Sequence, residues 1–157
     1  MNEPGSTIKQ IILAEDDEDD FLLFQEAVTG YQETIRLNWV KDGVELMNKL
    51  SLDKAEFPDM IFLDINMPRK NGFECLTEIR ENKVLKHLPV IIFSTSSDKA
   101  LVRWMYNAGA NLYLCKPNDF RNLKRSIHQV ISLDWKKQTP YPPVEDFILD
   151  WSGMDKN

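Results

Sequence analysis

Five short runs of apolar residues, separated by amphipathic stretches, limit what this chain can fold into. The runs are Ile8–Ala14, Ile35–Val40, Met60–Asp64, Val90–Ser94 and Leu112–Cys115. Most are apolar throughout rather than at alternate positions, which is typical of strands covered on both faces in parallel sheets. Repeated strand–helix order with right-handed crossovers then predicts an α/β fold: a doubly wound, five-stranded parallel sheet with helices on both faces.

Helical spacing of apolar residues follows each run. Gly30 stands where a glycine ends the first helix, and Asp98 can cap the fourth. The predicted helices cover residues 18–29, 44–50, 73–82, 98–108 and 123–131.

Polar residues follow four of the five strands, at the edge where doubly wound sheets place their sites. They are Glu15 and Asp16, Asp64, Ser94 and Thr95, and Lys116 followed by Pro117. If the first and third strands are neighbours, their carboxylates lie roughly 5–10 Å apart. Such a cluster is costly unless a carboxyl is protonated or a cation neutralises it, and Mg²⁺ suits oxygen ligands of this kind.

The first of these strands runs into six consecutive acidic residues, 15–20. The simpler interpretation is a solvated acidic segment, and we interpret Asp17, Glu18, Asp19 and Asp20 as a solvated helix N-terminus, where acidic side chains interact favourably with the helix dipole. An EF-hand is excluded, since the mid-loop glycine and closing glutamate are missing at the required spacing. For Glu15, Asp16 and Asp64 the sequence favours a cation site.

Composition narrows the class of protein further. The net charge of −6 argues against a nucleic-acid-binding surface, which needs clustered lysine and arginine. No secretory signal is recognisable, and the longest apolar runs are too short to span a bilayer. Two cysteines without CxxC spacing are expected to be reduced thiols. We therefore expect a soluble, acidic, cytoplasmic single domain.

Taken together and in this order, the strand-end residues resemble the response-regulator receiver family, the CheY-like proteins. The resemblance covers about Ile8 to Ile131 and rests on Glu15-Asp16, "DINMPRKNG" from Asp64, Ser94 after "PVIIF", Tyr113, and Lys116-Pro117. It implies a flavodoxin-like strand order, 2-1-3-4-5. Within the family, "DINMPRKNG", "LPVIIFSTS" and the trailing "DW" are most similar to single-domain regulators that partner phytochrome-type histidine kinases.

The resemblance also implies a role for each site residue. Asp64 would be the phosphoacceptor, assisted by Lys116 and by Ser94. Mg²⁺ would be held by Glu15, Asp16, Asp64 and the backbone carbonyl of Asn66. Ser94 and Tyr113 would form the switch, and the peptide bond between Lys116 and Pro117 would be cis.

The implied function is that of a single-domain response regulator in a two-component phosphorelay. Its phosphodonor would be a histidine kinase or a histidine phosphotransfer protein, and it would signal by binding a further protein. It would act on no other substrate and catalyse only its own phosphorylation and dephosphorylation. No nucleic-acid or membrane partner is expected, and a homodimer is left open.

Two other functions deserve comparison. A pseudo-receiver would bind partners regardless of phosphate, but the intact Asp16, Asp64 and Lys116 argue against it. A phosphatase of the haloacid-dehalogenase type would carry a second aspartate two residues after the nucleophile, where this chain has Asn66.

We divide the chain into a flexible N-terminus (1–7), the receiver domain (8–135) and a C-terminal extension (136–157). The extension begins as a proline-rich linker, but its apolar residues are too many for a free coil. They are Val144, Phe147, Ile148, Leu149 and Trp151. Packing onto the extension's own domain and docking onto another molecule are equally compatible with this pattern.

Overall fold

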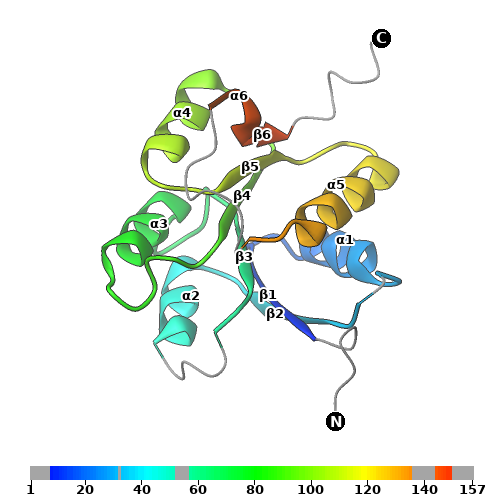
Figure 1. The fold of residues 1–157 in the computed structure, drawn as a ribbon, viewed down its shortest axis with the longest axis horizontal. Helices are drawn as coiled ribbons and strands as arrows, with labels where there is room; N and C mark the ends of the chain where they lie inside the picture. The colour runs from blue at the N-terminus through cyan, green and yellow to red at the C-terminus, as the bar shows by residue number, and fades with distance from the viewer. Residues whose placement is uncertain (1–7, 32, 52–56, 136–143, 150–157) are drawn as a thin grey trace.

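A computed structural model describes residues 8–31, 33–51, 57–135 and 144–149. Its centre is one parallel sheet with the strand order β2-β1-β3-β4-β5-β6 (Figure 1). The first five strands confirm the predicted fold and order. The strands are β1 (Lys9–Ala14), β2 (Ile35–Val40), β3 (Met60–Leu63), β4 (Val90–Ser94), β5 (Leu112–Cys115) and β6 (Ile148–Leu149).

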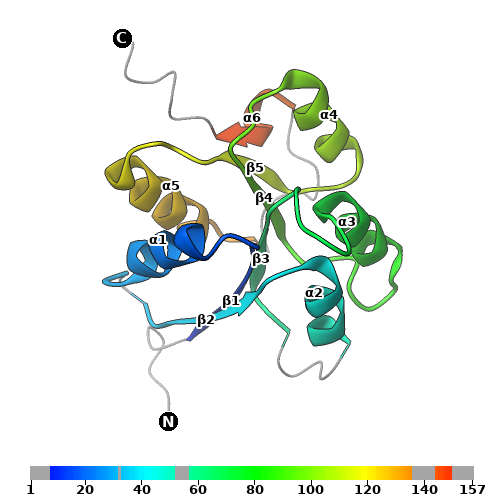
Figure 2. The ribbon, with the colours of Figure 1, turned by 180° about the vertical axis from the view of Figure 1, so that it is seen from behind.

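Helices cover both faces of the sheet, as Figures 1 and 2 show from opposite sides. Helices α1 and α5 lie side by side on one face, and α2, α3 and α4 line the other. The helices are α1 (Glu18–Val28), α2 (Gly43–Leu50), α3 (Gly72–Glu81), α4 (Lys99–Asn107), α5 (Phe120–Ser132) and the short α6 (Val144–Phe147).

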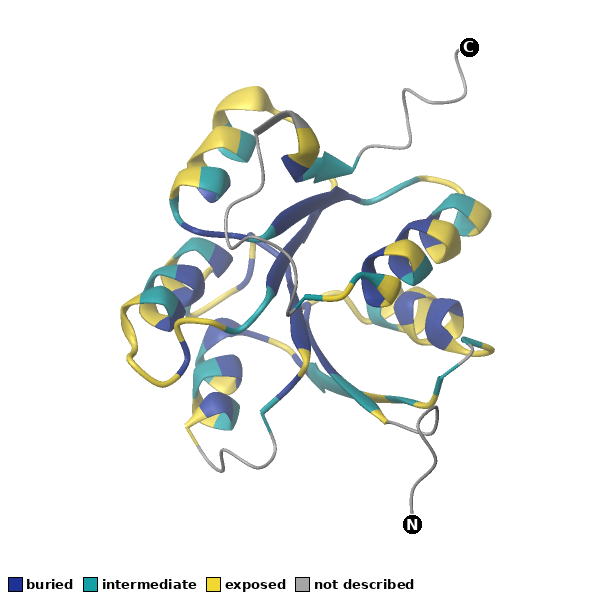
Figure 3. Ribbon diagram, in the orientation of Figure 1, coloured by how far each residue is buried: buried dark blue, intermediate teal, exposed yellow. Residues whose placement is uncertain are grey.

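The central strands are buried on both faces, which is why their sequences are apolar throughout (Figure 3). Successive side chains of a strand point to opposite faces. Ile11 and Leu13 therefore pack with the residues of α1 and α5, whereas Ile12 and Ala14 pack with those of α2, α3 and α4. No described helix is long and apolar enough to cross a membrane.

Each of the five longer helices begins at a side chain that accepts a backbone N–H. Asp17, which we assigned to a solvated helix N-terminus, accepts the N–H groups of Asp19 and Asp20 and thus fixes the start of α1. The remaining caps are Asp42 for α2, Asn71 for α3, Asp98 for α4 and Asp119 for α5. These caps place the helix starts directly after the loops at the carboxyl edge of the sheet.

The described part of the C-terminal extension packs onto its own domain. Strand β6 pairs in parallel with β5, with Tyr113 opposite Ile148 and Leu114 opposite Leu149. Phe147 is fully buried against α4 and β5. The sheet therefore has a sixth strand, which we did not predict. Trp151 and the predicted flexible residues 1–7 lie outside the described residues.

Candidate functional site

The carboxyl ends of β1 and β3 bring three acidic side chains together. One carboxylate oxygen from each of Glu15, Asp16 and Asp64 lies within 4.8 Å of the other two. The cause is the register of two neighbouring parallel strands, in which Ala14 pairs with Leu63 and the Asp64 N–H donates to the Ala14 carbonyl at 3.0 Å. Glu15 and Asp64 are buried, whereas Asp16 is exposed.

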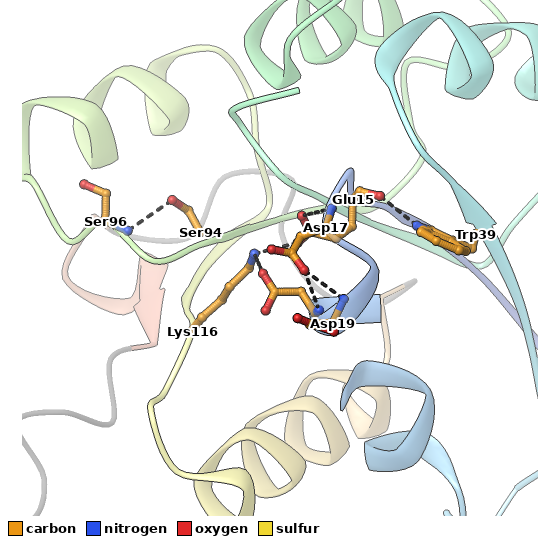
Figure 4. Close-up of polar contacts among 8 residues, drawn as sticks. Glu15, Asp17, Asp19, Trp39, Ser94, Ser96 and Lys116 are labelled. Atoms are coloured by element: carbon orange, nitrogen blue, oxygen red, sulfur yellow. Dashed lines mark hydrogen bonds and ion pairs between the residues drawn. The ribbon is translucent and has the colours of Figure 1, made fainter. Parts of the chain in front are cut away.

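A half-buried lysine reaches this cluster from the end of β5 (Figure 4). The Lys116 ammonium lies 2.5 Å from Glu15 Oε1 and 3.0 Å from Asp20 Oδ2. It also lies 4.8 Å from the centroid of the Phe93 ring, a cation–π contact. The Lys116 backbone N–H donates to the Ser94 carbonyl at 2.7 Å, which holds the loop after β5 against β4.

The electrostatics of the cluster follow from its burial. Desolvation raises the pKa of Glu15 to about 8, although Lys116 opposes this shift and the charge of Asp64 adds to it. Desolvation also raises the pKa of Asp64, while Lys116 and the backbone N–H groups of Ile65 and Asn66 oppose the rise. For Lys116, desolvation lowers the pKa, but Glu15 and Asp64 outweigh it and the net direction is upward. One ammonium thus leaves the carboxylates short of positive charge.

The donor set fits a hard divalent cation. Mg²⁺ prefers carboxylate and carbonyl oxygens and keeps several waters, so it needs an open side. The exposed Asp16 provides that side, and the shifted pKa values of Glu15 and Asp64 indicate carboxylates that a cation would stabilise in the charged form. Asn66 is exposed in the loop that follows β3, beside Asp64.

Ser94 is the last residue of β4, and Tyr113 lies on the neighbouring strand β5. Ser94 is 2% exposed, and its hydroxyl accepts the Ser96 N–H at 3.2 Å (Figure 4). The Tyr113 ring is fully buried, and its hydroxyl donates to the Ser96 carbonyl at 2.6 Å. Both side chains therefore bond to the same loop residue. The Phe147 ring packs near Tyr113, with centroids 6.3 Å apart, and contacts Tyr106 with centroids 5.1 Å apart.

Three features of the site differ from expectation or were missed. The peptide bond between Lys116 and Pro117 is trans rather than cis, in line with the preference of X–Pro bonds outside special turns. Asp20, which we assigned to a solvated helix N-terminus, pairs with Lys116 at 3.0 Å, a contact that no local spacing in the sequence indicates. Trp39 donates its indole N–H to the Glu15 carbonyl at 2.7 Å (Figure 4). No pattern in the sequence predicts this hydrogen bond.

Comparison with known proteins agrees with this geometry. Residues 11–128 match the family model described as the response regulator receiver domain. Response regulator Rcp1 of Synechocystis sp. is 30% identical over 146 residues, which is 90% of this chain and 99% of the relative. The probable methanogenesis regulatory protein FilR2 of Methanothrix harundinacea is 31% identical over 123 residues, covering 76% of this chain and 79% of the relative.

Solved structures give the same picture. The Mn²⁺-bound form of Rcp1 is 31% identical with a TM-score of 0.72, over 86% of this chain and 99% of the other. The phosphorylated cyanobacterial phytochrome response regulator RcpA is 32% identical with a TM-score of 0.71, over 87% of this chain and 100% of the other.

Proposed function

The chain belongs to the response regulator receiver family, and on that premise we propose that Asp64 accepts a phosphoryl group from a histidine kinase or histidine phosphotransfer protein. The observation that carries this proposal is the meeting of Glu15, Asp16 and Asp64 within 4.8 Å, with the Lys116 ammonium bonded to Glu15. The similarity of this chain to Rcp1 and to RcpA, a phytochrome response regulator, makes a phytochrome-type kinase the favoured donor.

In the proposed reaction, a carboxylate oxygen of Asp64 attacks phosphorus in line, forming an O–P bond as the P–N bond to the donor histidine breaks. The imidazole leaves with the bonding electron pair. Lys116 turns from Glu15 and Asp20 toward the phosphoryl oxygens and neutralises part of their charge. Ser94 donates its hydroxyl to another of these oxygens.

Mg²⁺, when bound, supplies further neutralisation of charge on the phosphoryl oxygens. Glu15, Asp16, Asp64 and the Asn66 carbonyl would hold it. The chain then catalyses only its own phosphorylation and dephosphorylation, and its output is the binding of a downstream protein.

Phosphotransfer from a phosphorylated histidine kinase is expected to stop when EDTA is added. It should also need a higher Mg²⁺ concentration in the variant Asp16→Asn than in the variant Asp19→Asn. Asp16→Asn removes a ligand, and loss of even a supporting partner commonly costs a site about tenfold or more in metal affinity. Asp19→Asn removes another exposed carboxylate, from α1. Labelled phosphoryl transfer is measured against Mg²⁺ concentration.

The midpoint of that titration should rise at least about tenfold for Asp16→Asn and stay near wild type for Asp19→Asn. Equal shifts in both variants would favour a diffuse acidic surface over a defined cation site. Undiminished transfer in EDTA would contradict the proposed role of the metal.

We also propose that the Ser94 hydroxyl begins the switch. A phosphoryl group on Asp64 offers a charged acceptor, and a charge-assisted hydrogen bond is stronger than the bond Ser94 makes to Ser96. Ser96 in turn holds the Tyr113 hydroxyl, so release of this loop loosens the start of α4. Because the Tyr113 ring is already buried, the response of Tyr113 is a change of hydroxyl partner rather than an inward turn.

Beryllofluoride with Mg²⁺, a mimic of the phosphoryl group, is expected to change amide exchange over residues 97–108. Ser94→Ala should blunt the change while Asp64 can still be phosphorylated. Ser126→Ala, another fully buried serine but on α5, is the control and should respond as wild type. Identical exchange with and without beryllofluoride at proven occupancy would instead favour the phosphate-independent adaptor.

A further inference from the structure

The carboxyl end of β2 carries no expected metal ligand, yet it contacts the loop after β1. Trp39 donates its indole N–H to the Glu15 carbonyl at 2.7 Å, and the Glu15 N–H donates to the Val40 carbonyl at 3.0 Å. Both polar backbone atoms of Glu15 are thus bonded to β2 residues. Because Glu15 and Asp16 are consecutive, this pair of bonds sets the position of two carboxylates at once.

The Trp39 ring is held in place by its own contacts. It stacks on Phe21 of α1 with centroids 4.1 Å apart and an interplanar angle of 3°. The Lys41 ammonium lies 5.0 Å from the centroid of the Trp39 ring. A ring that is already fixed loses little side-chain entropy when its N–H makes a hydrogen bond. The indole is therefore a preorganised donor to the loop after β1.

The segment after β2 also holds the loop that follows β3 and Asp64. Arg69 donates from its Nε and one terminal nitrogen to Asp42 Oδ2, at 3.0 and 2.8 Å. The Gly43 N–H donates to the Lys70 carbonyl at 3.1 Å. Arg69 has a φ of 65°, in the left-handed region that costs an arginine about 1 kcal/mol. Its ion pair with the buried Asp42 offsets that cost.

The segment after β2 and the loop that follows Asp64 are packed too closely to admit even one more carbon atom at Gly43. A Cβ added to Gly43 would lie 2.2 Å from the Lys70 carbonyl oxygen and 2.6 Å from the Cys75 sulfur. The start of α2 is thus packed directly on the loop that follows Asp64. A shift in either segment must move the other.

We propose that Trp39 and Asp42 are positioning residues for Mg²⁺ binding: Trp39 in β2 and Asp42 just after that strand hold the two loops that carry the ligands. This inference rests on the proposed function. Supporting partners of this kind orient ligands without touching the metal, and their loss lowers affinity. The mechanism differs for the two residues, because Trp39 acts on a backbone carbonyl and Asp42 acts through Arg69.

Mg²⁺ titration followed by amide NMR tests the Trp39 branch. Trp39→Phe keeps an aromatic ring to stack on Phe21 but removes the N–H. Trp135→Phe is the matched control. The Trp135 indole also donates to a backbone carbonyl, that of Val130 on α5 at 3.2 Å, and this bond does not involve the loops of the acidic cluster. Loss of one hydrogen bond predicts about a three- to tenfold weaker Mg²⁺ affinity for Trp39→Phe and no change for the control.

The Asp42 branch has its own pair of variants. Asp42→Asn keeps an oxygen that can accept the Glu45 N–H at the start of α2 but loses the charge that pairs with Arg69. Asp98→Asn makes the same change at the start of α4 and is the control. Arg69→Gln breaks the pair from its exposed partner. The double variant Asp42→Asn/Arg69→Gln should lose no more Mg²⁺ affinity than the weaker-binding single variant, because both substitutions remove the same ion pair.

A second measurement separates this inference from the proposed function. Amide exchange in the metal-free protein should speed up over residues 15–17 in Trp39→Phe and over residues 64–72 in Asp42→Asn and Arg69→Gln. Wild-type exchange and wild-type Mg²⁺ affinity in these variants would overturn the inference. Failure of wild type itself to bind Mg²⁺, with faster loop exchange in the variants, would overturn the proposed function and leave the positioning of the loops supported.

Discussion

Gly72→Ala is expected to lower the free energy of unfolding by about 3 kcal/mol, the upper part of the range for an overpacked contact. A Cβ at this position would lie 2.3 Å from the Asp64 carbonyl oxygen and 2.8 Å from the Cα of Ile65. Both are backbone atoms, so no flexible side chain can move away. The Gly72 N–H also donates to the Ile65 carbonyl at 2.8 Å, which ties the start of α3 to the segment that must shift.

The same substitution is expected to slow phosphorylation by acetyl phosphate by about a hundredfold, because a misplacement of about 1 Å commonly costs that much. Denaturant unfolding and the phosphorylation rate under fully folded conditions measure the two effects. Gly30→Ala is the control. Gly30 has a φ of 84° but no atom within 4 Å of an added Cβ, so backbone strain of about 1 kcal/mol is expected there without a change in rate. Wild-type stability and rate in Gly72→Ala would contradict the geometry described here.

The sequence was sufficient to predict the sheet because its central strands are buried on both faces. Three strand ranges, Ile35–Val40, Val90–Ser94 and Leu112–Cys115, agree with the structure at both ends. The pattern is less informative for α2: Val44, Met47 and Leu50 have helical spacing, whereas Leu46 and Leu50 are the buried apolar residues. An eight-residue helix has too few turns for its apolar spacing to define one face.

The tail could not be placed from sequence for a different reason. A strand of two residues has no recognisable period, and an apolar segment has the same sequence whether it packs on its own domain or on another molecule. The structure places Phe147 against Tyr106 and Tyr113, so the described part of the extension covers the face formed by α4 and β5.

Residues of the candidate site that directly follow a strand could be predicted from the sequence. Residues that reach the site only through the direction of their side chains could not. Glu15, Asp16, Asp64 and Lys116 meet because parallel strands end at one edge. Asp20 and Trp39 also contact this site, but only the folded chain shows that a helix turn and an edge strand point them inward.

The assignment of Asp64 as the phosphoacceptor is tested most directly by intact-mass measurement after incubation with acetyl phosphate and Mg²⁺. Wild type should gain the mass of one phosphoryl group, and Asp64→Asn should gain none, because an amide cannot form the acyl phosphate. Asp59→Asn is the matched control: Asp59 precedes the same strand at its opposite end, where its carboxylate accepts the Gln10 N–H at 2.7 Å. The control should gain one phosphoryl group. An equal gain in Asp64→Asn would contradict the assignment.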